Sequence, residues 1–197
     1  MATTRTNKNI SDFKSALIGG GARPNLFEVE LTTLPDAVTG WDADIFRFMC
    51  KAAALPAQNI ANIDVPFRGR IFKVAGDRTI DTWTVTVIND EDFRIRNAFE
   101  EWTQQIANLD TNIGATDPSA YMTNAKVFQL GRGTTKSSKD SNGTDNVVLK
   151  EYEFVDIFPT TVSSIDLSYD TGDTIEEFTV EFQVQSLNLA GAGSPNG

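Results

Sequence analysis

The most regular pattern in the chain lies near its C-terminus, where apolar and polar side chains alternate over residues 175–187. The apolar set is Phe178, Val180, Phe182 and Val184, and the polar set is Glu177, Thr179, Glu181 and Gln183. A period of two residues is typical of a strand with one buried face. Similar alternation predicts further strands over residues 25–31, 79–88, 125–130, 147–158 and 161–167. The predicted fold class is therefore mainly β (α+β).

A second pattern has the helical period and predicts an amphipathic helix over about residues 90–109. Its apolar stripe is formed by Ile95, Phe99, Trp102, Ile106 and Leu109. These spacings place all five side chains on one helical face. Asn89 is a suitable N-cap, and the acidic residues 90–92 would lie in the first turn, where the helix dipole favours negative charge. We expect this stripe to anchor the helix against the sheet.

Residues 60–76 predict a hairpin or arm that projects from the sheet. The stretch is rich in β-branched and aromatic side chains, but Pro66 and Gly69 interrupt it. Proline cannot donate a hydrogen bond to a strand ladder, which disfavours a central strand. We expect an edge hairpin that ends in a turn at residues 75–78.

Three polar segments flank these elements within one predicted domain of residues 1–197. Residues 1–24 form a predicted N-terminal arm with one helical turn around residues 13–18. Residues 131–146 form a flexible polar insert, and residues 188–197 form a disordered tail. A chain of this length buries roughly 70% of its unfolded surface, which is enough for a core without disulfides. Residues 44–55 do not fit either period clearly.

Composition restricts the possible chemistry. The formal net charge is −10, from 27 acidic and 17 basic residues, and histidine is absent. This balance disfavours a protein that grips nucleic acid through its phosphates, although it permits one that lets nucleic acid pass. The single cysteine, Cys50, cannot form an internal disulfide and lies in an apolar run typical of a buried, inert thiol.

No motif predicts catalysis, a cofactor or a metal. The stretch GRGTTKSS at residues 131–138 lacks the spacing of a phosphate-binding loop, and residues 140–145 lack the closing Glu of a calcium loop. A serine nucleophile would have no histidine partner. The N-terminus has no apolar signal segment, and no run approaches a membrane span, so we expect folding in a reducing cytoplasm.

Acidic residues recur on the polar faces of three predicted strands: Glu28 and Glu30, Glu151 and Glu153, Glu177 and Glu181. One interpretation is an ordinary solvated sheet face. The other is a single sheet whose polar face lines a water-filled space. The pattern alone leaves both open.

Four long stretches resemble the tail tube proteins of T-even-like, contractile-tailed bacteriophages. They are ARPNLFEVEL (22–31), FRFMCKAAALP (46–56), VPFRGRIFKVAGDRTIDTWTVTVINDEDFRIRNAFEEW (65–102) and FPTTVSSIDLSYDTGDTIEEFTVEFQ (158–183). The resemblance covers nearly the whole chain, except that residues 131–146 and the tail after residue 187 are longer than the family pattern. Mainly on this resemblance, we expect residues 44–55 to form a strand that ends before Pro56.

The resemblance implies a structural role and no enzymatic activity. It implies a β-sandwich or barrel with one flanking helix, and hexameric rings that stack into the inner tube of a phage tail. The implied partners are further copies, the tail sheath, baseplate and tail terminator proteins, and DNA that passes through without specific binding. The chain would be assembled in the host cytoplasm and become part of the virion. Similar tubes in contractile bacteriocins and type VI secretion are the alternative function.

Two sets of residues are the candidates for this role. The resemblance suggests that the tube lumen is lined by Glu28, Glu30, Glu177 and Glu181, with Glu151 and Glu153 as further candidates. An acidic wall repels phosphates close to its surface, so DNA would slide without binding. The second set lies on the arm, which the resemblance directs toward a neighbouring subunit: Phe67, Arg68, Arg70, Asp77 and Arg78. Its charges would form inter-subunit ion pairs that set register, unless the arm is only a solvated hairpin.

Overall fold

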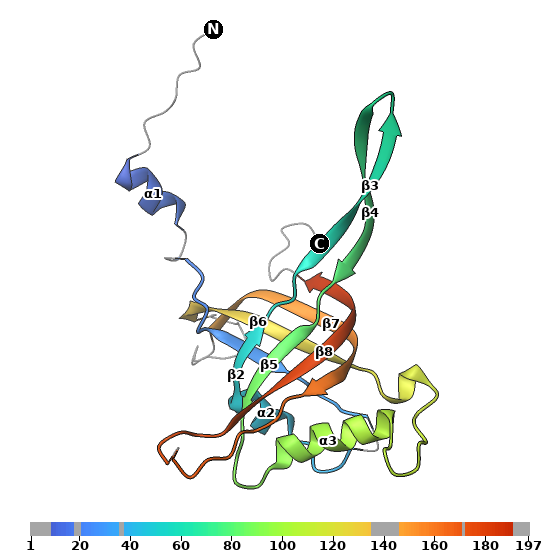
Figure 1. Cartoon of the computed structure of the whole chain (residues 1–197). Coiled ribbons are helices and arrows are strands. Elements are labelled where there is room, and N and C mark those ends of the chain that lie inside the picture. The colour runs from blue at the N-terminus through green and yellow to red at the C-terminus, as the bar shows by residue number, and fades with distance from the viewer. Residues whose placement is uncertain (1–8, 18–20, 36–37, 135–145, 171, 191–197) are drawn as a thin grey trace. The chain divides into compact units, whose positions relative to one another are not determined.

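The structure is a computed structural model that describes residues 9–17, 21–35, 38–134, 146–170 and 172–190. Its helices are α1 (Ile10–Ala16), α2 (Ala43–Met49), α3 (Arg94–Ile106) and the short 3-10 helix η2 (Pro118–Ala120). Its strands are β1 (Phe27–Glu30), β2 (Cys50–Ala54), β3 (Gln58–Phe67), β4 (Arg70–Ile80), β5 (Trp83–Ile88), β6 (Thr123–Thr134), β7 (Asn146–Val162) and β8 (Glu177–Ala190) (Figure 1). The predicted class, mainly β with a flanking helix and a projecting arm, is confirmed.

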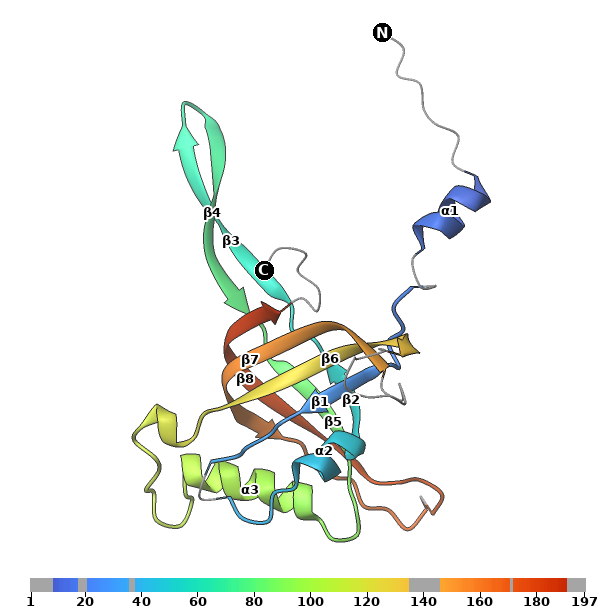
Figure 2. The same ribbon diagram turned by 180° about the vertical axis from the view of Figure 1, so that it is seen from behind.

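The chain divides into two compact units, and each is described by itself. Unit 1 comprises residues 1–28, 128–151 and 191–197, and unit 2 comprises residues 29–127 and 152–190. A six-stranded sheet has the order β1-β6-β7-β8-β5-β2, and a separate two-stranded sheet pairs β3 with β4. The parts of these six strands that lie in unit 2 curl toward a barrel, with β1 and β2 as the outer strands (Figure 2). The predicted single domain and N-terminal arm stay predictions. Residues 188–190 of the predicted disordered tail belong to β8, and residues 191–197 lie outside the described residues.

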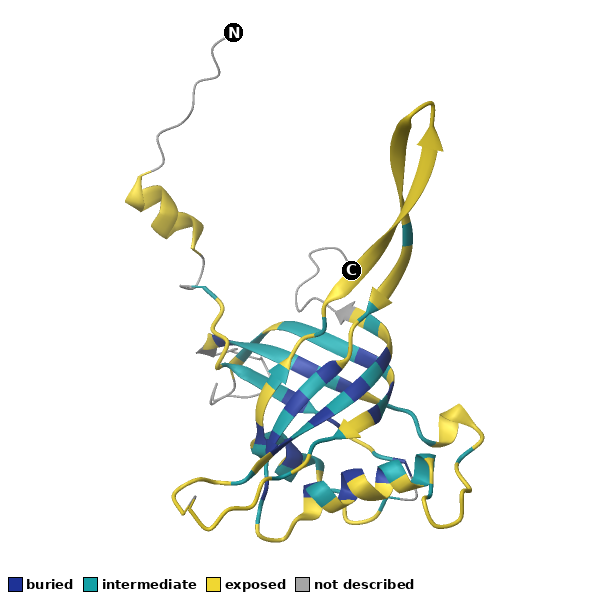
Figure 3. Ribbon diagram, in the orientation of Figure 1, coloured by how far each residue is buried: buried dark blue, intermediate teal, exposed yellow. Residues whose placement is uncertain are grey.

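The inner face of the curled sheet forms the core of unit 2. In the antiparallel pair β5–β8, inward residues face each other as Trp83–Phe182, Val85–Val180 and Val87–Phe178. All six are buried (Figure 3). The Trp83 ring stacks on Phe154 of β7 with ring centroids 4.6 Å apart. The strict alternation read from the sequence therefore corresponds to one apolar core face.

Helix α3 lies across one end of this sheet in Figure 1. Ile95, Phe99 and Trp102 are buried, and the Phe99 ring lies 5.8 Å from that of Phe182. Each such side chain stabilises the fold by about 1.5–3 kcal/mol when fully buried. The Trp102 indole Nε1–H donates to the Tyr121 carbonyl oxygen at 2.7 Å, so its polar atom is also satisfied.

Two details of the predicted helix are wrong. Its N-cap position is Phe93, in a left-handed conformation without a side-chain cap, and its first turn holds no acidic residue. Asn89 is instead buried and bonds to Glu176, because the chain turns once between β5 and α3 before the helix starts. The stripe also ends early, since Leu109 lies beyond the helix and is exposed.

The predicted strand at residues 44–55 is a helix followed by a strand. The Asp42 side chain caps α2 by accepting from the backbone N–H groups of Asp44 and Ile45, at 3.0 and 3.2 Å. The chain then extends at Cys50 and pairs with β5. Two periods in succession explain why neither fitted the whole segment.

The predicted strand at residues 161–167 is also wrong. Strand β7 continues without a break to Val162, and residues 163–170 contain no strand. Asp156 has a φ of 55°, and the buried positions shift from Phe154 to Ile157 across it. An extra residue of this kind is typical of a β-bulge, which lets one long strand bend around the barrel.

The hairpin β3–β4 projects from the curled sheet of unit 2 (Figures 1 and 2). It is longer than predicted, and its turn lies at Arg68 and Gly69, not at residues 75–78. Both turn residues have positive φ, 45° and 80°, as in the two-residue turns that match strand twist. The predicted turn is instead a register shift within the hairpin, opposite Ile60–Asn62.

Unit 1 contains α1 and the ends of three strands. Asn9 and Asp12 form a reciprocal capping box at the start of α1, and none of the helical residues is buried. The Leu130 backbone N–H donates to the Leu26 carbonyl oxygen at 2.9 Å. Strand β6 extends to Thr134 and β7 begins at Asn146, so only residues 135–145 of the predicted insert lie outside the described residues.

Candidate assembly surfaces

The hairpin β3–β4, called the arm below, is exposed along almost its whole length. Cross-strand pairs place five large apolar side chains on one face: Ile63, Val65, Phe67, Phe72 and Val74. All five are exposed, with Phe67 at 67% and Phe72 at 68%. An isolated two-stranded hairpin is marginally stable in water. An apolar face on such an element is typical of a surface that is covered by a partner.

The opposite face of the arm is more polar. Asp64 and Lys73 are cross-strand neighbours, and their carboxylate and ammonium groups lie 3.6 Å apart. Pro66 and Ile71 form the next pair toward the tip. The two faces therefore differ in chemistry, which would orient the arm in a complex.

The predicted charged residues of the arm lie at its tip and near its base. The Arg68 guanidinium stacks over the Phe67 ring at 5.3 Å, and Arg78 donates a hydrogen bond to the Gln58 side chain. Among the described residues, Arg70 and Asp77 form no ion pair. The sequence interpretation emphasised these charges and missed the apolar face. The alternation of Ile63, Val65 and Phe67 with polar or small residues could have predicted this apolar face.

The outer face of β5 and β8 is mostly polar, with Ile88 as its one large apolar side chain among the paired residues. Its cross-strand pairs are Thr84–Glu181, Thr86–Thr179 and Ile88–Glu177. Strand β2 adds Ala52 and Ala54 beside Thr86 and Thr84.

The six predicted lumen residues lie on three strands of one sheet, and the structure does not gather them into one cluster. Glu28 and Glu30 are on β1, which β6 and β7 separate from β8. Glu177 forms an ion pair with Lys51 of β2, and Glu153 accepts a hydrogen bond from Asn188 at 3.3 Å.

Burial controls the chemistry of Cys50. Loss of hydration raises the pKa of its thiol from 9.0 to about 12, against a smaller opposite effect of backbone hydrogen bonding at Ala52. The thiolate is the nucleophile and the metal ligand, so this side chain is inert at neutral pH. Its burial agrees with the interpretation of the sequence.

The described residues offer little else that could bind a small ligand. They contain no group of three acidic or cysteine side chains able to hold a metal ion. None of their helices has the length and apolar character to cross a membrane. A groove of about 330 Å³ lies at the base of the arm, between residues 78–80 and 183–187.

Comparison with known proteins identifies the class. The chain matches the phage tail tube protein family over residues 22–189, and it belongs to that family. It is 38% identical over 162 residues to the tail tube protein gp19 of Enterobacteria phage T4, covering 82% of this chain and 88% of the relative. The tail tube protein of Serratia phage KSP90 is 25% identical over 179 residues, covering 88% and 93%. The chain is thus a tail tube subunit of a contractile phage, a virion component and not an enzyme.

Solved structures share the fold at low sequence identity. A chain of the anti-feeding prophage baseplate aligns with a TM-score of 0.61 and 10% identity, over 87% of this chain and 96% of that one. A chain of the sheath–tube complex of an extracellular contractile injection system, PVC, in its extended state, aligns with a TM-score of 0.56 and 12% identity, over 94% and 99%. Helix α1 precedes the residues that match the family.

Proposed function

We propose that six copies of this chain form a ring, and that rings stack into the inner tail tube of a contractile phage. The observation that carries the proposal is the exposed apolar face along the arm of a chain that belongs to the tail tube family. Such an arm becomes stable when it packs on a neighbouring copy. The similar baseplate chain comes from a structure described as 6-fold symmetrised, which supports six copies per ring.

The outer strands of the sheet would join copies within the ring. In the part of the chain that the structure describes, β2 pairs on one side with β5 and has no strand on its other side. Unpaired strand edges invite association, and closing a sheet through several subunits removes them. The tail sheath, baseplate and terminator proteins would then contact the completed tube.

An acidic wall would let DNA pass through the bore without being held. The candidate residues fall into two groups by strand position: Glu177 and Glu181 of β8 with Glu151 and Glu153 of neighbouring β7, and Glu28 and Glu30 of β1. Phosphates are repelled from whichever group faces the bore, within a Debye length of about 8 Å.

Electron microscopy of the purified protein tests the assembly. Hollow tubes made of rings with sixfold symmetry are the expected result. A protein that stays monomeric at high concentration, with its arm still exposed, would overturn the proposal.

Thiol labelling of assembled tubes tests the bore. E181C and E30C each add one accessible thiol, whereas Cys50 is buried and serves as the unreactive background. A bore residue reacts with a small maleimide but not with one carried on a long polymer. A thiol that reacts equally with both reagents lies on the outside of the tube.

A second candidate function is a tube subunit of a contractile injection system. The fold similarity to anti-feeding prophage and PVC chains favours it. Such a tube would carry protein cargo or none. Particles that enclose nuclease-protected DNA in the tube would support the phage function, whereas a neutral or basic bore would support the alternative.

A further inference from the structure

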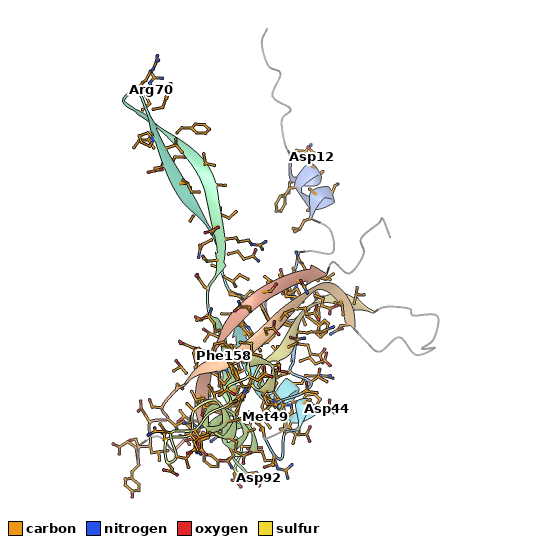
Figure 4. All side chains as sticks on the ribbon, turned by 90° about the vertical axis from the view of Figure 1, so that its right-hand side faces the viewer. Asp12, Asp44, Met49, Arg70, Asp92 and Phe158 are labelled. Atoms are coloured by element: carbon orange, nitrogen blue, oxygen red, sulfur yellow. The ribbon has the colours of Figure 1, made fainter. Side chains whose placement is uncertain are left out.

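The two ends of unit 2 carry opposite charge. The arm tip, residues 67–72, has the sequence FRGRIF and carries two arginines and no acidic residue. The other end is formed by residues 90–93 and by the described residues of segment 163–176, which are 163–170 and 172–176, called the acidic end below. Figure 4 shows Arg70 of the arm tip and Asp92 of the acidic end at opposite extremes of this unit.

The acidic end is one surface made of two segments. The Asn89 backbone N–H donates to the Glu176 carbonyl oxygen at 2.9 Å, and the Asn89 side-chain amide donates to the Glu176 carboxylate at 2.9 Å. These bonds hold the turn after β5 beside the segment before β8. The two segments contain seven acidic residues: Asp90, Glu91, Asp92, Asp166, Asp170, Asp173 and Glu176. Two arginines of α3 adjoin them, because Arg94 forms an ion pair with Asp92 at 3.6 Å and Arg96 donates to the Ser163 carbonyl oxygen at 2.8 Å. The acidic excess therefore lies mainly on segment 163–176.

Both ends also expose apolar side chains. At the acidic end these are Leu167, Tyr169 and Ile175, with Phe93 half-exposed. At the arm tip they are Phe67, Ile71 and Phe72. Leu167 is 85% exposed and Tyr169 entirely so. Charged groups around exposed apolar side chains are typical of the rim and centre of a protein interface.

We infer that the acidic end of one copy is the receptor for the arm tip of the next copy along the tube. The inference rests on the proposed function and identifies which surfaces meet. Phe67 and Phe72 contact the apolar residues of segment 163–176. Arg68 and Arg70 lie against its carboxylates, chiefly Asp166 and Asp170. These charge pairs fix the register of the contact and disfavour other partners.

Charge also selects the direction of stacking. An arm-to-arm contact would bring the arginines of two tips together, and a contact between two acidic ends would bring two surfaces with an acidic excess together. Only the head-to-tail contact pairs opposite charges. A head-to-tail contact between opposite ends of a subunit does not close, so it generates an open stack. The tube is therefore polar, with arms exposed at one tip and acidic ends at the other.

Complementary charge reversal tests the pairing. The arm variant is R68E/R70E, and the receptor variant is D166K/D170K. Each variant alone is expected to lose tube formation, because like charges then face each other at every junction. An equal mixture is expected to form tubes in which the two variants alternate, and the combined four-residue variant is expected to polymerise by itself. Negative-stain electron microscopy and sedimentation measure all four samples.

Conservative variants provide the matched controls. R68K/R70K and D166E/D170E keep each charge in place and are expected to form tubes, and circular dichroism checks that every variant is folded. Tubes of wild-type length from D166K/D170K alone, or a mixture that stays unassembled, would overturn the pairing. A wild-type chain that forms no tubes would overturn the proposed function itself, and the pairing with it.

Discussion

The arm and the block formed by β5, β8 and α3 are both rich in large apolar residues, yet they have opposite fates. In the block, Trp83, Phe99 and Phe182 are fully buried against one another. In the arm, Phe67 and Phe72 are exposed. The block finds its apolar partner within one chain, whereas no other described segment covers the apolar face of the arm. The difference separates residues that stabilise the monomer from residues that are available for assembly.

The largest effect on monomer stability is expected in the block. Phe182→Ala removes a ring that contacts Trp83, Phe99 and Trp102, with centroids 5.2, 5.8 and 6.0 Å away. Deleting a buried aromatic ring costs about 3–5 kcal/mol of unfolding free energy. Urea denaturation measures this loss. The matched control is Phe48→Ala, since Phe48 is 79% exposed and its removal is expected to change stability by less than about 0.5 kcal/mol.

A smaller loss is expected where the block meets the acidic end. Asn89→Ala removes the hydrogen bond that the Asn89 side-chain amide donates to the Glu176 carboxylate. The carboxylate then loses this donor in a partly buried position. The expected decrease in unfolding free energy is about 1–3 kcal/mol. Asn97→Ala on the exposed face of α3 is the control and should be nearly neutral. Equal effects of the two substitutions in urea denaturation would show that this hydrogen bond does not hold the turn.

Thiol reactivity distinguishes the block from the arm directly. Cys50 should resist alkylation at pH 8 in the folded protein and react once urea unfolds it, whereas an added I71C on the arm of the free monomer should react at once. Because the folded pKa of Cys50 is raised, the folded state holds its proton longer, and stability falls as pH rises from 9 toward 12. C50A should flatten this decline. Rapid labelling of native Cys50 would contradict its burial.

Substitutions in the arm are expected to change monomer stability least. They are also expected to abolish tube assembly. F67S/F72S removes two exposed rings, so unfolding free energy should change by less than about 0.5 kcal/mol. Tube formation should be lost because the coupling face is gone. Denaturation and electron microscopy of the same sample measure both. A stability loss of several kcal/mol would show that the arm packs on its own chain.

Local patterns predicted the elements whose partners are the adjacent strands or one helical face. The alternation of residues 175–187 corresponds to β8, and the stripe from Ile95 to Trp102 corresponds to the buried face of α3. Both follow from periodicity, because one face of each element must leave water. The class of fold followed from the same patterns, and the resemblance of the long stretches predicted the family that the comparison confirmed.

Patterns failed where the chain changes conformation within a few residues. The segment at 44–55 switches from helix to strand at Cys50, and the predicted N-cap at Asn89 instead bonds to Glu176, which is 87 residues away in sequence. Strand β7 runs past its predicted end at residue 158 to Val162, with the bulge at Asp156 inside it. Long-range contacts and single-residue shifts of register determine these conformations. Neither is visible in the pattern of neighbouring residues in the sequence.

The sequence by itself determined which side chains are apolar, their period along each element and the charge of every segment. Tertiary structure alone decided which apolar faces are covered within the monomer and which are not. It buried Phe182 and left Phe67 exposed, although both lie in alternating strands of similar composition. The physical reason is that burial depends on the neighbours a strand acquires. Strand β8 lies between β7 and β5, whereas β3 pairs only with β4 in the part of the chain that is described.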